Sequence, residues 1–323
     1  MIAFQLLEPI PHLRPVERLG FGCSNLLGDK TRAEGRSLLD AAFDAGIRHI
    51  DVARYYGYGD AEGIVGEFAR GKRDRITITT KFGLQPLKSM TALRGPIEAT
   101  RRMMRSSPLV RRFVRRGVRS LVSRGCFDVQ SARESLETSL RELKTDYIDC
   151  YLLHECSAAD CSDELVAFLL RARTEGKIRA FGVGASFVRT IPLLATWPEL
   201  TRIAQFEHNV FASEPERTAR RAAARGRRVI THGVLSTIEP LRARLRDDAA
   251  FAERARAATG CDLREPGVLA SFALHQAQRD NPDGFTIFRA SSAERIAANV
   301  RALEAAPPSD AALTAFESIA AAV

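Results

Sequence analysis

Eight short runs of apolar and β-branched residues alternate along the 323-residue chain with segments of helical periodicity. Strands that alternate with helices are typical of βαβ units, in which successive strands pair in parallel. Eight such units match a closed (β/α)8 barrel, the TIM barrel, which reaches this length as one domain. The strand-like runs cover residues 16–22, 49–53, 76–82, 147–153, 178–183, 202–206, 229–231 and 285–288.

Helical patterns fill the intervals between these runs, over residues 32–45, 61–70, 131–143, 163–175, 189–196, 215–225, 247–259, 266–279 and 293–305. Glycine is a common residue just past a helix end, and five segments are followed by Gly46, Gly71, Gly176, Gly226 and Gly260.

The main alternative fold is an open doubly wound sheet, whose first turn carries the pattern GxGxxG. Here Gly20 and Gly22 supply GxG, but Asn25 stands in place of the last glycine and no helical pattern begins there. We therefore predict an α/β protein that consists of a single (β/α)8 barrel domain over residues 1–323.

The positive charge of the chain is concentrated in one segment. The net charge is +9, yet residues 87–125 hold eleven Lys and Arg against one acidic residue, Glu98. That segment carries +10 and the rest of the chain −1, so the high isoelectric point is weak evidence for nucleic-acid binding. We treat residues 87–125 as an insertion within the barrel, between the third strand and its helix.

Composition narrows the class of protein further. Hydrophobic residues make up 45% and charged residues 27%, which is ordinary for a globular chain. No run approaches the ~18–20 apolar residues of a membrane helix, and the first residues lack the basic start of a signal peptide. We expect a cytoplasmic protein whose six cysteines are free thiols and which holds no metal.

Catalytic side chains of such barrels lie at the C-terminal ends of the strands and in the loops that follow. An acid, tyrosines, a lysine and histidines occupy those positions: Asp51, Tyr55, Tyr56, Tyr58, Lys81, His154 and His232. Only six of the 48 basic residues are lysines, so a lysine that closes a strand indicates a site that requires a compact ammonium group.

These residue types suit carbonyl chemistry. A phenol titrates near pH 10, which is too high for efficient proton transfer at pH 7. A nearby ammonium favours the phenolate and lowers the pKa of the phenol, and an aspartate would hold that ammonium. A histidine beside the phenol would position a carbonyl oxygen. The set would interconvert a carbonyl and an alcohol, given a hydride carrier.

Four ordered motifs resemble those of the aldo-keto reductases, over about residues 18–299 without the basic segment. Residues 46–66 carry Asp51 and, five positions later, Tyr56, followed by Glu62 at the start of a helix. The sequence Thr-Lys-Phe at 80–82, the segment 146–154 and the segment 291–299 match the other three.

The resemblance implies a role for each of four residues. Tyr56 would be the general acid and base, and Lys81 would lower its pKa. Asp51 would pair with Lys81, and His154 would orient the substrate carbonyl. Tyr55 competes for the role of Tyr56, but the five-residue offset from Asp51 selects Tyr56.

The resemblance also implies a nicotinamide cofactor, NADPH or NADP, with NAD as the alternative. Ser291 and Arg295 match positions that hold the adenosine 2′-phosphate, and Asn299 one that meets adenine. A helix begins in this segment, and helix N-termini attract phosphate.

The pattern departs from the family at the nicotinamide. Gly184 and Ala185 stand where a Ser-Asn pair often holds the carboxamide, and a histidine replaces the tyrosine that often stacks on the ring. The remaining cofactor contacts that we expect are Gly22, Ser186, Gln205 and His232.

A helical pattern within residues 108–124 places apolar residues on one face and arginines on the other. Three interpretations compete: a solvated arginine face, a lid over the active site, or peripheral attachment to an anionic membrane or acidic partner. A lid would favour an anionic substrate.

We therefore expect an NAD(P)(H)-dependent oxidoreductase with tyrosine acid–base catalysis, acting on a small carbonyl or sugar substrate and not on nucleic acid. The tyrosine-rich loop 54–60 is similar to that of aldose 1-dehydrogenases, so a sugar dehydrogenase is one alternative. A cofactor-binding regulatory subunit on the same barrel is the other.

Overall fold

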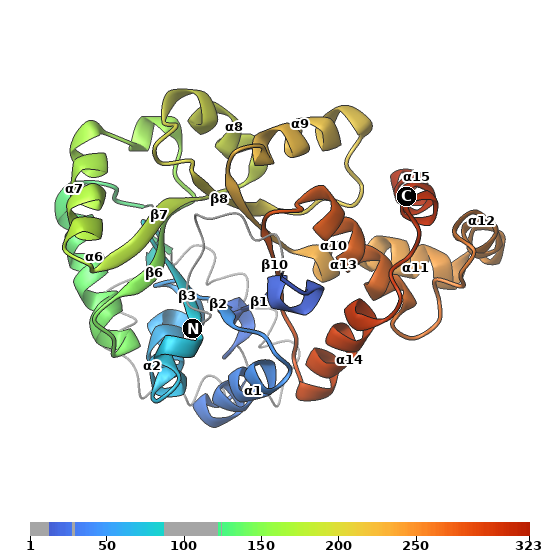
Figure 1. The fold of residues 1–323 in the computed structure, drawn as a ribbon, viewed down its shortest axis with the longest axis horizontal. Coiled ribbons are helices and arrows are strands. Elements are labelled where there is room, and N and C mark those ends of the chain that lie inside the picture. The colour runs from blue at the N-terminus through green and yellow to red at the C-terminus, as the bar shows by residue number, and fades with distance from the viewer. Residues whose placement is uncertain (1–12, 28–29, 87–121, 124) are drawn as a thin grey trace.

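Eight parallel strands close into a barrel in the order β1-β10-β9-β8-β7-β6-β3-β2, and helices surround it (Figure 1). The computed structural model describes residues 13–27, 30–86, 122–123 and 125–323. The strands are β1 (Leu19–Gly22), β2 (His49–Asp51), β3 (Thr77–Phe82), β6 (Ile148–His154), β7 (Ile178–Gly184), β8 (Ile203–Glu207), β9 (Arg228–His232) and β10 (Phe285–Phe288). The predicted (β/α)8 fold is confirmed.

Helices follow the strands around the barrel, and all five predicted C-terminal glycines adopt positive φ angles between 69° and 92°. The helices are α1 (Arg32–Asp44), α2 (Ala61–Ala69), α6 (Val129–Leu143), α7 (Asp163–Thr174), α8 (Phe187–Thr196), α9 (Glu214–Ala224), α10 (Val234–Thr237), α11 (Glu239–Asp247), α12 (Ala249–Thr259), α13 (Val268–Asp280), α14 (Ala293–Glu304) and α15 (Asp310–Ala321). The helices α10, α11 and α15 were not predicted from the sequence. Helices α11, α12 and α15 lie side by side at the edge of the barrel (Figure 1).

Two predicted elements need correction. The first strand begins at Leu19 rather than residue 16, because Pro15–Arg18 forms a 3-10 turn in which Glu17 accepts a hydrogen bond from the Arg14 backbone. Val122, which we assigned to the basic helix, lies instead in β5 (Val122–Ser123), paired antiparallel with β4 (Gln85–Pro86). The rest of that predicted helix falls outside the described residues.

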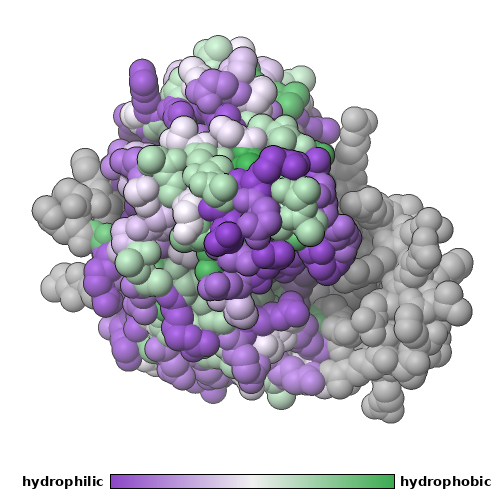
Figure 2. All heavy atoms as spheres, turned by 90° about the vertical axis from the view of Figure 1, so that its right-hand side faces the viewer, coloured by the Kyte–Doolittle hydropathy of each residue, from purple (hydrophilic) through white to green (hydrophobic). Residues whose placement is uncertain are grey.

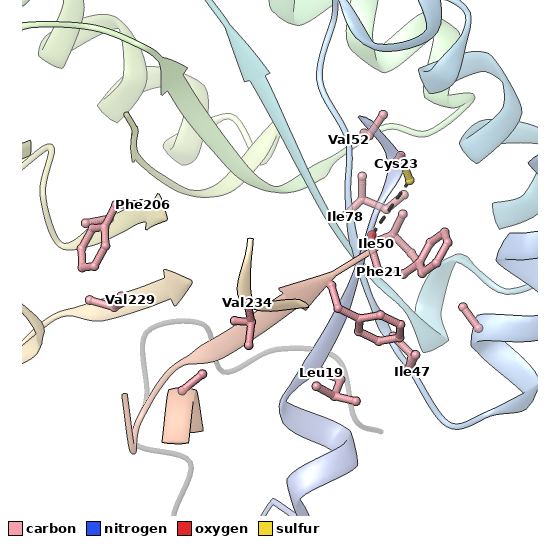
Figure 3. Packing of buried hydrophobic residues seen from close by; sticks show 14 of the residues in the cluster. Leu19, Phe21, Cys23, Ile47, Ile50, Val52, Ile78, Phe206, Val229 and Val234 are labelled. Atoms are coloured by element: carbon pink, nitrogen blue, oxygen red, sulfur yellow. Dashed lines mark hydrogen bonds between the residues drawn. The ribbon is translucent and has the colours of Figure 1, made fainter. Parts of the chain in front are cut away.

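Apolar side chains fill both sides of the barrel wall. Leu19 and Phe21 of β1 group with Ile50 of β2 and Ile78 of β3 on one side of neighbouring strands, as Figure 3 shows. A smaller cluster, which includes Leu152, Ile203 and Ile287, is contributed by strands around the barrel. Successive side chains of a strand point alternately into the barrel and outwards to the helices, which produces these two clusters. At the strand ends, the side chains that point inwards lie at the mouth of the barrel.

The face formed by the right-hand side of Figure 1 presents mainly polar side chains with scattered apolar ones (Figure 2).

None of the helices in the described ranges has the length and apolar character needed to span a bilayer. All six cysteines are free thiols, as expected. Among the described residues, no group of three or more His, Cys, Asp or Glu side chains could hold a metal ion.

His49 predicts a pH dependence of stability. It is buried in the barrel, with Nε2 3.3 Å from the Thr79 hydroxyl and its ring stacked on Phe285, and burial lowers its pKa from 6.5 to about 4. The unfolded chain therefore binds more protons between these values. The neutral imidazole's stabilising contribution is complete above pH 6.5 and is lost as the pH falls towards 4, by about 2 kcal/mol at pH 5.

We expect His49→Gln to lose less stability than the wild type between pH 7 and pH 5, measured by denaturant unfolding. Burial also lowers the pKa values of His154 and His208, but both proteins retain those residues, so the comparison isolates His49. Equal losses in the two proteins would show that His49 does not titrate in this way.

Candidate active site

The four predicted catalytic residues meet at one end of the barrel. Asp51 ends β2, Lys81 lies near the end of β3 and His154 ends β6, while Tyr56 begins the short helix η3 (Tyr56–Gly59) after β2. All four line a cavity of about 410 Å3. Parallel pairing of β2 with β3 and of β3 with β6 brings these ends to the same rim, which is why Asp51 and His154 become neighbours although they are far apart in the sequence.

Asp51 and Lys81 form a buried ion pair. The Lys81 ammonium lies 2.8 Å from both carboxylate oxygens of Asp51 and 3.0 Å from the Val52 carbonyl oxygen. Only 3% of the lysine side chain and 5% of the aspartate side chain are exposed. An ammonium has three N–H donors, and these three contacts direct them to fixed acceptors.

Gln205 holds the same carboxylate from another side. Its amide nitrogen donates to Asp51 Oδ2 over 2.8 Å. The amide oxygen lies beside Gly184, where an added Cβ would approach it to 3.3 Å. Gln205 therefore binds Asp51 with its N–H group and keeps a carbonyl oxygen at the cavity.

Tyr56 lies between the ion pair and His154. The Lys81 nitrogen is 5.2 Å from the centre of the Tyr56 ring, and the Tyr56 and His154 rings meet edge to face at 6.0 Å. Tyr55 is also close, 5.2 Å from His154 between ring centres. Both tyrosines therefore border His154.

The predicted lowering of the Tyr56 pKa is wrong for this structure. Desolvation of the phenol raises its pKa well above 10, and the Asp51 carboxylate raises it further. The Arg289 guanidinium lowers this pKa, but its effect is smaller than the effects of burial and of Asp51. Tyr56 is thus a neutral phenol at pH 7, a form that can donate a proton.

His154 is a neutral imidazole. Burial lowers its pKa well below 6.5, and the positive charge of Lys81 lowers it further. Its Nδ1 atom is buried without a hydrogen-bond partner among the residues that the structure describes. A neutral imidazole has one donor and one acceptor, so it can hydrogen-bond a carbonyl oxygen.

The predicted cofactor residues fall into two groups. Gly22, Gln205 and His232 line the cavity with the catalytic set. Ser186, the residue before α8, does not line it; its backbone N–H donates to the Glu155 carboxylate.

The other three residues lie at the start of α14 or within it. Arg295 and Asn299 are four residues apart in α14, so they share one face of the helix, and Ser291 lies just before the N-cap residue Ser292. Ser291 and Arg295 are exposed, and Arg295 forms no ion pair with any residue in the described part of the chain. The face is therefore available to an anionic group.

Further polar residues line the cavity that were not predicted from the strand ends: Ser24, Glu155, Glu207, Ser236, Thr237 and Arg289. Glu155 directly follows His154 and adopts a left-handed backbone with φ of 57°, and the Arg289 guanidinium lies 3.2 Å from the Ser24 hydroxyl. Both residues directly follow the last residue of a strand, so their positions in the sequence are the signal that identifies them.

These residues can accommodate the implied nicotinamide cofactor. Gly184 leaves room beside the Gln205 oxygen, and that oxygen can accept an amide N–H. The Arg295 guanidinium, which is exposed and makes no ion pair with a residue that the structure describes, suits a phosphate.

Comparison with known proteins supports the resemblance. The model of the Aldo/keto reductase family matches residues 18–321. A D-threo-aldose 1-dehydrogenase from a Pseudomonas species is 30% identical over 178 residues, which are 53% of this chain and 50% of that protein. An uncharacterized oxidoreductase of Bacillus subtilis is 29% identical over 173 residues, 53% of this chain and 45% of the relative. The alignments thus span about half the length of these curated relatives.

Solved structures share the fold along nearly the whole chain. An aldo-keto reductase of Bacillus halodurans in its holo form matches with a TM-score of 0.67 and 20% identity, over 94% of this chain and 91% of that one. An aldo-keto reductase of Klebsiella pneumoniae in complex with NADPH matches with a TM-score of 0.63 and 22% identity, over the same shares. With the family model matching from residue 18 to 321, the chain belongs to the aldo/keto reductase family.

Proposed function

We propose that this protein is an NADP(H)-dependent oxidoreductase that interconverts a carbonyl compound and an alcohol. The observation that carries the proposal is the meeting of Asp51, Tyr56, Lys81 and His154 in one cavity of an aldo/keto reductase barrel. Each of these groups lies in a position that suits carbonyl chemistry.

In the direction of reduction, the neutral Tyr56 phenol donates a proton to the carbonyl oxygen and becomes a phenolate. In the direction of oxidation, the Tyr56 phenolate accepts the proton of the alcohol and returns to the neutral phenol. His154 hydrogen-bonds that oxygen and fixes its position next to the phenol. The ammonium of Lys81, held by Asp51, supplies positive charge beside the phenol when it loses its proton. When bound, the nicotinamide supplies or accepts the hydride.

The cofactor assignment rests on the two groups of residues described above. The Gln205 oxygen and the space at Gly184 suit a carboxamide, and Ser291, Arg295 and Asn299 suit the adenosine end. A solved structural neighbour contains NADPH, which is consistent with the proposal. We therefore expect a preference for NADPH over NADH.

Arg295→Ala is expected to reduce that preference by roughly 10–100-fold, because a charge-assisted hydrogen bond contributes about 1.5–3 kcal/mol. Calorimetric dissociation constants for both cofactors measure the effect. Arg301→Ala is the matched control, since Arg301 is an exposed arginine of the same helix outside the predicted face. Equal affinity of the wild type for NADPH and NADH would contradict the assignment of Ser291 and Arg295.

We propose aldoses as the substrate class to be tested first. The hydroxyl and carboxylate groups around the cavity, among them Ser24, Glu155 and Thr237, can hydrogen-bond a substrate rich in hydroxyl groups. The likeness to a D-threo-aldose 1-dehydrogenase points the same way.

The deciding experiment is a panel of aldehydes, ketones and aldoses assayed in both directions with NADP(H) and NAD(H). Turnover of at least one carbonyl–alcohol pair is the expected result. Tight NADPH binding without turnover of any pair would favour the cofactor-binding regulatory subunit instead.

A further inference from the structure

Glu62 is a fully buried carboxylate outside the cavity. It is the second residue of α2, and 0% of its side chain is exposed. The Thr80 hydroxyl donates to Glu62 Oε1 over 2.6 Å, and the Arg54 guanidinium donates to Oε2 over 2.8 Å. Removing a carboxylate from water is costly unless it is paired and hydrogen-bonded, so both contacts are needed to keep Glu62 in place.

The two partners of Glu62 belong to the segments that carry the reacting pair. Arg54 precedes Tyr56 by two residues in the loop after β2, and Thr80 directly precedes Lys81 in β3. Successive side chains of a strand point to opposite faces. Thr80 therefore points outwards to α2, while Lys81 points into the cavity. Through Glu62, the loop of Tyr56 is tied to the strand of Lys81.

The loop requires such a restraint. Gly57 and Gly59 follow Tyr56 with positive φ angles of 58° and 94°, and glycine loses more conformational freedom on ordering than other residues. Arg54, Glu62 and Thr80 do not line the cavity, so they do not contact the substrate directly.

We propose that Arg54, Glu62 and Thr80 form a positioning bridge that sets the distance of the Tyr56 phenol from the Lys81 ammonium. The inference rests on the proposed function, in which these two groups act together. A displacement of about 1 Å at a reacting group can lower the rate on the order of 100-fold. A bridge that positions the reacting groups without touching the substrate therefore affects turnover.

Thr80→Val is the principal test, because it keeps the shape of the side chain and removes the donor to Glu62. We expect kcat to fall by about 10-fold or more with an unchanged dissociation constant for NADPH, and the pH profile of kcat to shift. Thr80→Ser retains the hydroxyl and should restore both. Glu62→Gln, which removes the charge, should behave like Thr80→Val.

Thr201→Val is the matched control. Thr201 is equally buried and its hydroxyl also makes internal hydrogen bonds, but it lies before β8, at the opposite end of the barrel from the cavity. The control variant should lose stability while kcat and the pH profile stay as in the wild type. If Thr80→Val does not fold, Arg54→Gln tests the bridge from its partly exposed end.

Hydrogen exchange gives a reading that does not need turnover. The bridge predicts faster exchange of the backbone amides of residues 54–60 in Thr80→Val than in the wild type and in Thr201→Val. If the wild type turns over no carbonyl, the proposed function fails, and exchange still decides whether the bridge orders the loop. Unchanged kcat, pH profile and exchange in both Thr80→Val and Glu62→Gln would overturn the inference.

Discussion

Tyr56→Phe is expected to lower kcat by about 10²–10⁴-fold on the best substrate, with normal folding and normal cofactor binding. The substitution removes only the phenolic oxygen, and that range is typical for loss of a general acid or base. The ring remains to pack against His154 and Tyr55. Steady-state kinetics, with a separate measurement of the NADPH dissociation constant, test the prediction.

Tyr55→Phe is the control, because Tyr55 also borders His154 and its phenol is likewise desolvated. Its effect should be much smaller, since the Lys81 ammonium lies over the ring of Tyr56. A Tyr56→Phe variant within about threefold of the wild type in kcat would contradict the assignment of the proton donor. A larger loss in Tyr55→Phe would transfer the role to Tyr55.

Lys81→Met is expected to lose both stability and turnover. Removing the ammonium leaves the buried Asp51 carboxylate with Gln205 as its side-chain donor, and breaking such a pair typically costs about 3–5 kcal/mol. Turnover should fall by at least about 10²-fold, because the positive charge beside the phenol is lost. Denaturant unfolding and kinetics measure the two effects separately.

The double variant Asp51→Asn/Lys81→Met separates stability from catalysis. It removes both charges, so much of the lost stability should return, since a neutral pair carries no desolvation penalty for an unpaired charge. Turnover should remain low. Recovery of turnover in the double variant would mean that Lys81 only balances Asp51 and has no part in the reaction.

The barrel was predictable because its signals are local. Glycines after the helices indicate a helix end with positive φ, and β-branched runs indicate buried strands. Both patterns can be recognised without knowledge of distant contacts. Helix α15 follows α14 with no strand between them, so the alternation of strands and helices did not predict it. The shortened first strand reflects the turn at Pro15, which overrode an apolar pattern.

The positions of the site residues were predictable from the rule that barrel chemistry lies at strand ends. Asp51, Lys81 and His154 all lie at or beside such ends, and all line the cavity. The direction of the Tyr56 pKa shift was not predictable, because it depends on how burial and the Asp51 charge compare with the Arg289 charge. Those magnitudes follow from three-dimensional packing alone.

The measurement that tests the central claim most directly is isotope transfer from the cofactor to the product. Wild-type protein is mixed with a carbonyl or aldose substrate of the panel and NADPH deuterated at the transferable position of the nicotinamide ring. We expect deuterium on the former carbonyl carbon of the alcohol, and a strongly reduced rate of its appearance with Tyr56→Phe. NADPH binding without deuterium transfer to any carbonyl of the panel would contradict the proposed function.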